Sequence, residues 1–417
     1  MLDISFIRQN VSQVKKACLD KQLDSSLVDR LLEVDEKRRT LKQKVDSIRR
    51  EVNENAEKIK QQVHQGGEPD SKLIKTGRQF KEQLKQVEPE FKQVSLKFES
   101  LMLKIPNVPA EEVPVGKDAA SNKVVRQVGD KSQFNFTPLS HEKVMENLDW
   151  LDIQRAVKIA GFRSYFLKNE AVLLERAILR YALDFMIKQG FSPMTVPVLV
   201  NQEALIGTGY FPWGEEDHYK TQDDKYLTGT AEVALTAYYM GETLTEDDLP
   251  IKIVGTSPCF RREVGSYGKD TQGIIRVHQF NKVEQVVLTV ADEKQSRLWH
   301  EKMLNYSEKL LQELGLAYQV VMMCTGDIGA GQRKKYDIET WFPAQKAYRE
   351  THSASYFNDF QTRRLGIKYQ AKDGTSKFAY SLNNTVLATP RLLAAIVENY
   401  QKADGSVEIP QALQQYL

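Results

Sequence analysis

Residues 260–284 read FRREVGSYGKDTQGIIRVHQFNKVE. The stretch begins with an aromatic-Arg-x-Glu tetrad and continues into a charged loop that contains Gly265, Gly268, Lys269, Asp270 and Gly273. It closes on residues 275–284, where period 2 predicts a strand with one face formed by Arg276, His278, Phe280, Lys282 and Glu284. Arginine suits a phosphate, an aromatic ring can stack on a base, and a carboxylate suits an amine. The predicted strand–loop–strand therefore suits a bound nucleotide.

Length and charge indicate two parts with different tasks. At 417 residues the chain exceeds the usual size of one domain, and its 41% of hydrophobic residues is enough for a large core. The formal net charge of +2 does not by itself mark a nucleic-acid binder. Residues 30–104, however, hold 18 Lys and Arg against 13 Asp and Glu. This positive excess favours a polyanionic partner in the first quarter of the chain.

Cysteine usage and the N-terminal residues indicate a reducing compartment. Cys18, Cys259 and Cys324 lie far apart in the sequence, so they predict neither a disulfide framework nor a zinc site. No apolar run approaches the length of a membrane span. The N-terminal MLDISFIRQN lacks the features of a signal peptide. We therefore expect a cytoplasmic protein without a membrane partner.

Two long helices are predicted in the N-terminal quarter, because apolar residues recur there with heptad spacing. In the second helix the 4-3 alternation is unbroken over residues 73–105, with Gly77 in one of its slots. The first helix has the same rhythm over residues 34–59, with Arg38 and Asn55 at two seam positions.

The run His64-Gln65-Gly66-Gly67-Glu68-Pro69-Asp70 between these helices is a turn by composition, so we expect an antiparallel hairpin. Helices of about 35 residues would reach on the order of 50 Å. Pro89 removes one backbone hydrogen bond and should bend or loosen the second helix. Heptads most often serve in dimerisation or as a spacer, and periodicity alone leaves that alternative open.

The rest of the chain predicts an α+β domain. Residues 105–135 contain Pro106, Pro109 and Pro114 and indicate a linker with short extended pieces. Beyond it, β-rich runs at 251–254 and 286–288 mix with amphipathic helical segments at 169–188 and 293–314. This order lacks βαβ repetition, and neither GxGxxG nor a Walker A sequence is present. A nucleotide site on an antiparallel sheet is the remaining option.

The stretch 260–284 resembles motif 2 of class II aminoacyl-tRNA synthetases, and the run RVHQFNKVE is similar to its seryl-tRNA synthetase version. The FRxE tetrad by itself is explained equally well by a polar β-hairpin with a solvated loop. Seryl-tRNA synthetases also carry an N-terminal helical hairpin, which holds the long variable arm of the tRNA. The resemblance implies a tRNA-binding coiled-coil arm over residues 1–110. It also implies a class II catalytic domain over residues 111–417, built on an antiparallel β-sheet with flanking helices.

Two further stretches resemble segments of the same family. The helix near 169–188, followed by FSPMTVP at 191–197, resembles motif 1 and implies a C2 homodimer, although Pro197 alone would be a strand-edge proline. Thr230-Ala231-Glu232 resembles the segment that holds serine, although this tripeptide alone is more often the start of a helix. Apart from these two stretches, residues 207–212 (GTGYFP) look like a mobile loop that could close over the substrate.

The C-terminal motifs imply a metal site and a phosphate site. Glu350 and Ser353 match the metal-binding pair of the family, and such oxygen ligands suit Mg²⁺. The common serine before Ser353 is replaced by His352, which we expect to support the site rather than bind the metal. Residues 383–391 (NNTVLATPR) resemble motif 3, although Asn384 and Pro390 stand where glycine is common. Arg391 would then lie in a first helical turn, which favours an anion, unless it is an ordinary surface residue.

The resemblance implies that ATP and Mg²⁺ activate L-serine to seryl-adenylate and that tRNA(Ser), with tRNA(Sec) as a further candidate, accepts the seryl group. The implied catalytic residues are Arg261, Arg391 and Glu350. The implied ATP-binding residues are Arg261, Arg262, Glu263, Arg276, Val277, Phe280, Glu350, Thr351, His352, Ser353 and Arg391. The implied serine-binding residues are Thr230, Ala231, Glu232, Arg261, Glu284, Asn383 and Thr385. Phosphates of tRNA could be bound by Lys42, Arg49, Arg50, Lys75, Arg78 and Lys81.

Two other functions compete with this interpretation. A synthetase paralogue could pass its amino acid to a carrier protein, but such a protein would be expected to lack the long arm. A catalytically dead coiled-coil protein could bind RNA, but it would have no need of Arg261 and Arg391, and both are present.

Overall fold

The computed structural model describes residues 1–264 and 273–417, so the loop glycines and charges at 265–270 lie outside the described residues. The chain divides into two units. One comprises Leu2–Leu19 and Leu23–Pro106, and the other comprises Met1, Asp20–Gln22 and Asn107–Leu417.

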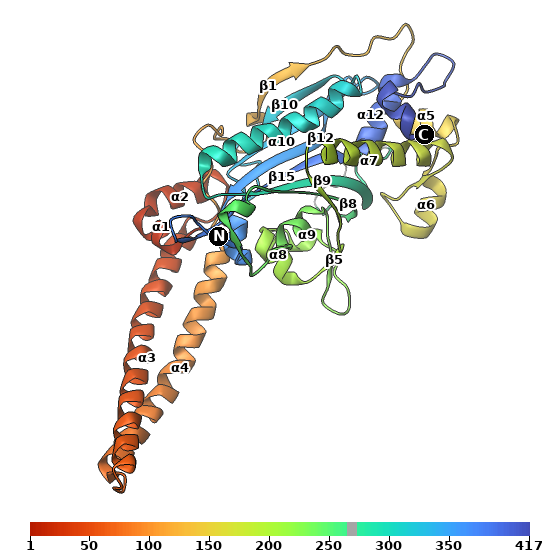
Figure 1. The fold of residues 1–417 in the computed structure, drawn as a ribbon. Helices are drawn as coiled ribbons and strands as arrows, with labels where there is room; N and C mark the ends of the chain where they lie inside the picture. The colour runs from red at the N-terminus through yellow and green to blue at the C-terminus, as the bar shows by residue number, and fades with distance from the viewer. Residues whose placement is uncertain (265–272) are drawn as a thin grey trace. The chain divides into compact units, whose positions relative to one another are not determined.

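The N-terminal unit is helical, and the predicted pair of long helices is confirmed. Its helices are α1 (Ile4–Gln9), α2 (Val11–Asp20), α3 (Ser26–His64) and α4 (Ser71–Lys104). Helices α3 and α4 pack on each other as an antiparallel hairpin (Figure 1). Their seam buries Val45, Ile48 and Val87, as the heptad pattern requires. Helix α4 continues through Pro89 without interruption.

Polar residues of the seam fit together across the hairpin. Asn55 Nδ2 donates to the carbonyl oxygen of Leu73 at 2.9 Å. A Cβ at Gly77 would lie 2.7 Å from that same Nδ2, so glycine leaves room for the asparagine. The guanidinium carbon of Arg38 lies 4.0 Å from the centroid of the Phe98 ring. This cation–π contact accommodates a charged residue at an otherwise apolar seam position.

The second unit is built on an eight-stranded sheet in the order β1-β10-β11-β12-β15-β9-β8-β4. Neighbouring strands are antiparallel, except that β4 and β8 are parallel. The strands are β1 (Lys123–Val128), β4 (Ser192–Thr195), β8 (Ile251–Phe260), β9 (Gln279–Thr289), β10 (Tyr318–Met322), β11 (Lys334–Phe342), β12 (Ala347–Asn358) and β15 (Tyr380–Ala388). This confirms the α+β class and the antiparallel sheet.

Helices cover both faces of this sheet (Figure 1). The larger core forms against α7 (Glu170–Lys188), α10 (Glu293–Glu313) and α12 (Arg391–Tyr400). The opposite face carries α8 (Gln202–Thr208), α9 (Glu232–Ala237) and α11 (Phe360–Leu365). Outside these layers lie α5 (His141–Asn147), α6 (Ile153–Ala160) and small sheets formed by β2 (Leu151–Asp152), β3 (Phe166–Leu167), β5 (Leu199–Val200), β6 (Tyr226–Leu227), β7 (Thr243–Thr245), β13 (Lys368–Gln370) and β14 (Ser376–Phe378).

Strand alternation separates the core from the candidate site. On β15, Leu382 and Val386 are buried in the larger core, whereas Asn383 and Thr385 point to the opposite face. Strand β9 alternates in the same way. One face of the central strands is therefore buried and mostly apolar, with Gln285 and Asn384 both donating to the carbonyl oxygen of Met303 on α10. The other face presents polar groups to a cavity.

The strand predicted over 275–284 is wrong in its first part. Strand β9 begins at Gln279, and residues 273–278 precede it outside the sheet. The polar–apolar alternation misled the prediction because backbone groups of residues 274–276 are bound by side chains instead of a neighbouring strand. Arg391 Nε, for example, donates to the carbonyl oxygen of Ile275 at 2.9 Å.

Within the ranges 1–264 and 273–417, no helix is both long and apolar enough to cross a membrane. The three cysteines are free and buried.

Candidate active site

A polar cavity of about 220 Å³ lies on the sheet face opposite the larger core. It is bounded by strands β9, β11, β12 and β15, by residues 275–277, and by the N-terminal ends of α9 and α12. Its lining mixes cations with carboxylates: Arg261, Arg276, Lys282, Lys335 and Arg391 with Glu232, Glu263, Glu284 and Glu350. A site of this composition suits a ligand that carries several charges of both signs.

The structure brings most of the predicted ATP- and serine-binding residues together in this cavity. Those that line it are Glu232, Arg261, Glu263, Arg276, Val277, Phe280, Glu284, Glu350, Thr351, His352, Ser353, Asn383, Thr385 and Arg391. Three do not line it. Arg262 is exposed and donates to the carbonyl oxygen of Glu216, and Thr230 Oγ1 accepts from the backbone N–H of Glu232. Ala231 is buried in an apolar cluster with Leu235, Ile253 and Val286.

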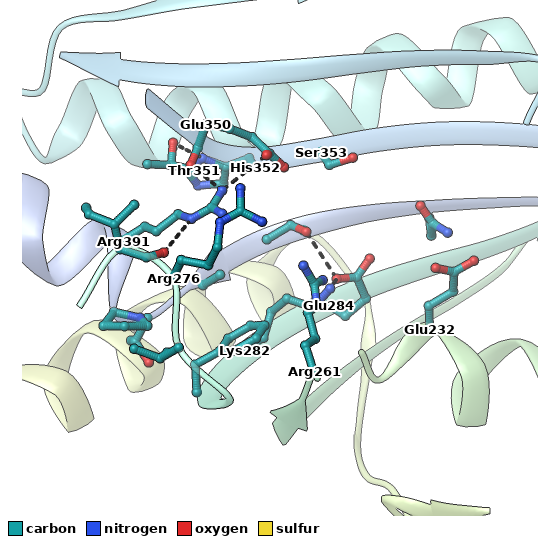
Figure 2. A pocket seen from close by; sticks show the side chains of 18 of the residues that line it. Glu232, Arg261, Arg276, Lys282, Glu284, Glu350, Thr351, His352, Ser353 and Arg391 are labelled. Carbon is teal, nitrogen blue, oxygen red and sulfur yellow. Dashed lines mark hydrogen bonds and ion pairs between the residues drawn. The ribbon is translucent and has the colours of Figure 1, made fainter. Parts of the chain in front are cut away.

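One end of the cavity is dominated by arginine (Figure 2). Arg391 is the first residue of α12, as predicted, and its Nη1 lies 3.1 Å from Glu350 Oε2. Arg276 Nη1 lies 2.7 Å from Glu263 Oε2. Although burial opposes its charge, Arg391, Lys335 and Arg261 together lower the pKa of Glu350 to about 2. Glu350 is therefore ionised at neutral pH and available to a cation.

Arg261 and Phe280 lie between the two ends of the cavity. The Arg261 guanidinium carbon is 5.2 Å from the centroid of the Phe280 ring. Arg261 Nε also donates to the carbonyl oxygen of Gly229 at 3.4 Å, which orients the fork of the guanidinium. The pair offers a cation for a phosphate beside a ring on which a base can stack.

The other end is formed by two buried carboxylates with different partners (Figure 2). Glu232 accepts neutral hydrogen bonds from Tyr210 Oη at 2.8 Å and from Gln361 Nε2 at 2.8 Å. Burial, and then the nearby carboxylate of Glu284, raise the pKa of Glu232, while the two donors lower it. A ligand ammonium group would relieve the cost of this buried charge.

Glu284 has a cation of its own. Its Oε2 lies 2.6 Å from Lys282 Nζ and accepts from Thr385 Oγ1 at 3.3 Å. Because Lys282 neutralises this carboxylate, Glu284 is better suited to accept a hydrogen bond from a hydroxyl than to hold a second ammonium group.

Glu350 and Ser353 fit a magnesium ion that brings its own water and phosphate ligands. Mg²⁺ is usually held through one or two carboxylates plus substrate phosphates. Across the strand pair, Ser353 faces Asp337, whose carboxylate lies 3.0 Å from Lys335 Nζ; burial raises the pKa of Asp337 to about 7. In the described part of the chain, no three or more His, Cys, Asp or Glu residues are grouped so that they could hold a metal ion.

His352 lies in the cavity wall beside this pair. Its Nδ1 is 2.8 Å from Thr351 Oγ1, and burial lowers its pKa to about 4. A neutral, buried imidazole that is already bonded to its neighbour fits the expected supporting role.

Several lining residues were given no role by the sequence: Gln332, Lys335, Ser355 and Thr389. Lys282 was placed on the correct face by strand alternation but was given no role. The segment 207–212 was expected to be a loop, but α8 extends to Thr208, and Tyr210 is bonded to Glu232. This segment is therefore part of the cavity wall.

The basic residues predicted for tRNA are all exposed on α3 and α4: Lys42, Arg49, Arg50, Lys75, Arg78 and Lys81. Two of them make exposed ion pairs, Lys42 with Asp46 and Arg49 with Glu88, each at 2.7 Å. Such pairs contribute little stability, so these cations can exchange their partners for phosphates.

Comparisons with known proteins agree with the site. Residues 216–400 match the tRNA synthetase class II core domain (G, H, P, S and T), and residues 1–109 match the seryl-tRNA synthetase N-terminal domain. The chain is 44% identical to the serine–tRNA ligase of Deinococcus radiodurans, a match that covers 100% of this chain and 97% of that protein.

Solved structures give the same answer. Seryl-tRNA synthetase from Pyrococcus horikoshii, complexed with ATP, has a TM-score of 0.91 at 38% identity, over 100% of this chain and 98% of that one. The cytoplasmic serine–tRNA ligase from Naegleria fowleri, in complex with AMP, has a TM-score of 0.87 at 34% identity, over 100% of this chain and 97% of that one. The fold, the cavity and the full-length matches together show that this chain belongs to the seryl-tRNA synthetase family of class II aminoacyl-tRNA ligases.

Proposed function

We propose that the chain activates L-serine with ATP and transfers the seryl group to tRNA(Ser) in the cytoplasm. The observation that carries this proposal is the division of one cavity into an arginine-rich end and a carboxylate end, with Arg261 between them. The arginine-rich end suits a nucleoside triphosphate, and the carboxylate end suits a small amino acid with an ammonium and a hydroxyl group.

ATP occupies the arginine-rich end. Phe280 stacks on adenine, while Glu263 and the backbone of Val277 bind the edge of the base. Arg261 binds the α-phosphate, and Arg391 binds the γ-phosphate at the start of α12, where the helix dipole also favours an anion. Mg²⁺, when bound through Glu350 and Ser353, supplies charge neutralisation for phosphate oxygens.

Serine occupies the carboxylate end. Glu232 holds the α-ammonium group because its direct hydrogen-bond partners, Tyr210 and Gln361, are neutral. Glu284, with Thr385 beside it, accepts the hydrogen bond of the serine hydroxyl, and Asn383 completes the wall. The serine carboxylate then faces Arg261 and the α-phosphate.

The reaction needs no protein nucleophile. A serine carboxylate oxygen attacks the α-phosphorus, the bond to the β-phosphate oxygen breaks, and pyrophosphate leaves. The terminal ribose hydroxyl of tRNA then attacks the seryl carbonyl, and AMP leaves. Arg261 stabilises the charge that develops at the α-phosphate, so the chain acts through positioning and electrostatics.

The N-terminal hairpin, residues 1–110, supplies the tRNA contacts. Its exposed cations and positive excess suit the phosphates of a long variable arm. The catalytic domain, residues 111–417, forms a C2 homodimer through the region of α7 and β4. Large apolar side chains at Leu173 and Ile187 of α7 are exposed in the single chain, at 51% and 42%, which suits a buried contact. Light scattering would test the dimer.

ATP–pyrophosphate exchange with a panel of amino acids tests the central proposal. Serine alone should drive exchange. Alanine would leave the buried polar groups of Glu284 and Thr385 unpaired, a penalty that can reach about 10⁴-fold. Threonine carries an extra methyl group that the cavity must exclude. Better exchange with another amino acid would refute serine as the substrate while leaving the family intact.

A further inference from the structure

Side chains bind the backbone of residues 274–276, whereas His278 is bonded to the backbone of Arg163 and Arg261. Ile275 and Val277 of the segment 273–278 line the nucleotide end of the cavity. The segment precedes β9 and lies outside the sheet. Arg391 Nε binds the carbonyl of Ile275, and Arg163 Nη1 donates to the carbonyl oxygen of Arg276 at 3.1 Å. Its geometry is therefore set by distant parts of the chain.

A third side chain, His141 of α5, binds the start of this segment. The backbone N–H of Ile274 donates to His141 Nε2 at 3.2 Å. Since an amide N–H can only donate, Nε2 must carry the lone pair, and the ring proton is on Nδ1. Nδ1 in turn donates to Glu398 Oε1 at 2.8 Å. The hydrogen bonds thus define one neutral tautomer of the imidazole.

Glu398 links His141 to the helix that carries Arg391. It lies on α12, is completely buried, and also accepts from the backbone N–H of His141 at 3.1 Å and of Ala344 at 3.1 Å. A carboxylate with these donors is satisfied without a cation. One end of α12 therefore contacts the segment through Arg391, and a later turn contacts it through Glu398 and His141.

Gly273 is an independent sign of how closely His141 approaches. A Cβ at this position would lie 2.1 Å from His141 Nε2, and the backbone has a φ of +62°. Any side chain here would displace the imidazole or the segment. Glycine thus permits the approach that the hydrogen bond to Ile274 requires.

We infer that His141 and Glu398 are a positioning pair for the nucleotide, because they hold residues 273–277 at the distance from which Val277 and Ile275 reach the cavity. Neither residue lines the cavity itself, so the pair acts through the segment. The inference rests on the proposed binding of ATP in this cavity. Ile274 is completely buried, so without the Nε2 acceptor its N–H would be left unpaired and the segment would have to shift.

Two variants separate the two hydrogen bonds of the imidazole. In His141→Gln, the side-chain oxygen can reach the position of Nε2 and still accept from Ile274. In His141→Asn, the shorter amide can replace only Nδ1–H, so the contact with Glu398 survives while that with Ile274 is lost. Both remove the same ring from the same buried position, so each is the control for the other.

The measurements are the calorimetric Kd for ATP with Mg²⁺, the KM for serine in exchange, the midpoint of thermal unfolding, and hydrogen exchange in a peptide that spans residues 273–278. For His141→Asn we expect Kd(ATP) to rise roughly tenfold, as for the loss of one buried hydrogen bond, with faster exchange in that peptide. For His141→Gln, Kd(ATP) and the exchange rate of that peptide should both lie close to the wild-type values. Its thermal unfolding midpoint should nevertheless fall as far as that of His141→Asn. The KM for serine should change less than Kd(ATP).

The inference is overturned if His141→Asn leaves Kd(ATP) and the 273–278 peptide unchanged. It is equally overturned if both variants raise Kd(ATP) and the KM for serine alike, in proportion to their loss of thermal stability. Such a result would mean that His141 has a structural role alone. If His141→Asn does not fold, Gly273→Ala provides the same test by crowding Nε2 without removing the ring. A wild-type chain that binds ATP but activates another amino acid would refute the proposed substrate, and the Kd values would still decide the role of His141.

Discussion

Replacing Tyr210 by phenylalanine should shift the pH range in which the chain binds serine. The α-ammonium group requires Glu232 to be ionised, and burial raises the pKa of this carboxyl group. Tyr210 Oη donates to Glu232 Oε2 at 2.8 Å and holds that pKa down. Burial and the neighbouring carboxylate raise the pKa of Tyr210 itself well above its usual value, so its hydroxyl remains a donor at all assay pH values. Tyr210→Phe removes this donor and little else.

The size of the shift follows from the type of hydrogen bond. A hydrogen bond to a charged group contributes about 1.5–3 kcal/mol. Since about 1.4 kcal/mol is a factor of ten in an equilibrium constant, loss of this donor should lower the ionisation constant of Glu232 roughly ten- to a hundredfold, which raises its pKa. Serine binding is lost as the pH falls through this pKa, so the acidic limb of the pH profile should move to higher pH.

The assay is kcat/KM for serine in ATP–pyrophosphate exchange between pH 5 and 9. Tyr181→Phe is a matched control, because Tyr181 Oη donates to Glu313 Oε2 at 2.6 Å in a pair outside the cavity. The control should lose stability without moving the profile. The KM for ATP should be unchanged in both variants.

The folded-state pKa of Glu232 lies above its unfolded value, so its contribution to stability is present at low pH and is lost as the pH rises through the folded pKa. A higher pKa in Tyr210→Phe enlarges that loss, so the variant should be less stable relative to wild type at pH 8 than at pH 5. An acidic limb that stays in place, or a KM for ATP that rises with the KM for serine, would show that Glu232 does not hold the ammonium group.

Four further perturbations test the cavity and the N-terminal arm. Arg261→Ala should lower serine-dependent exchange by about two or more orders of magnitude while circular dichroism stays native, and near-normal exchange would remove Arg261 from the site. Glu350→Gln should raise the Mg²⁺ concentration for half-maximal exchange at every pH between 5 and 8, because the pKa of Glu350 is about 2 and the lost carboxylate is ionised throughout this range. Deleting residues 30–104 should spare exchange, because every cavity residue lies in the other unit, but should abolish charging of tRNA(Ser); an arm-deleted protein that charges at the intact rate would make the hairpin a spacer. A milder, salt-dependent loss of charging should follow the replacement by glutamine of Arg49, Arg50, Lys75 and Arg78.

Local sequence patterns determined the elements whose structure depends on near neighbours. The heptads predicted α3 and α4 because a helical seam repeats every few residues. Gly77 and Asn55 interrupt the apolar pattern without ending the helices, and they lie opposite each other across the seam. Pro390 before an apolar helical run predicted Arg391 in a first helical turn. The cavity residues that belong to recognisable motifs could likewise be named in advance.

Only the tertiary structure decided those features that depend on hydrogen bonds between distant segments of the chain. Residues 275–278 have the alternation of a strand, yet Arg391 and Arg163 bind the carbonyl groups of residues 275 and 276 from elsewhere in the chain. His141 likewise accepts from the N–H of Ile274. Gln361 reaches Glu232 across 129 positions of sequence, and no local period marks it. Periodicity records which face of an element is buried, whereas the partner of a buried polar group is fixed only when distant elements pack, because that packing excludes water and leaves a single donor or acceptor within reach.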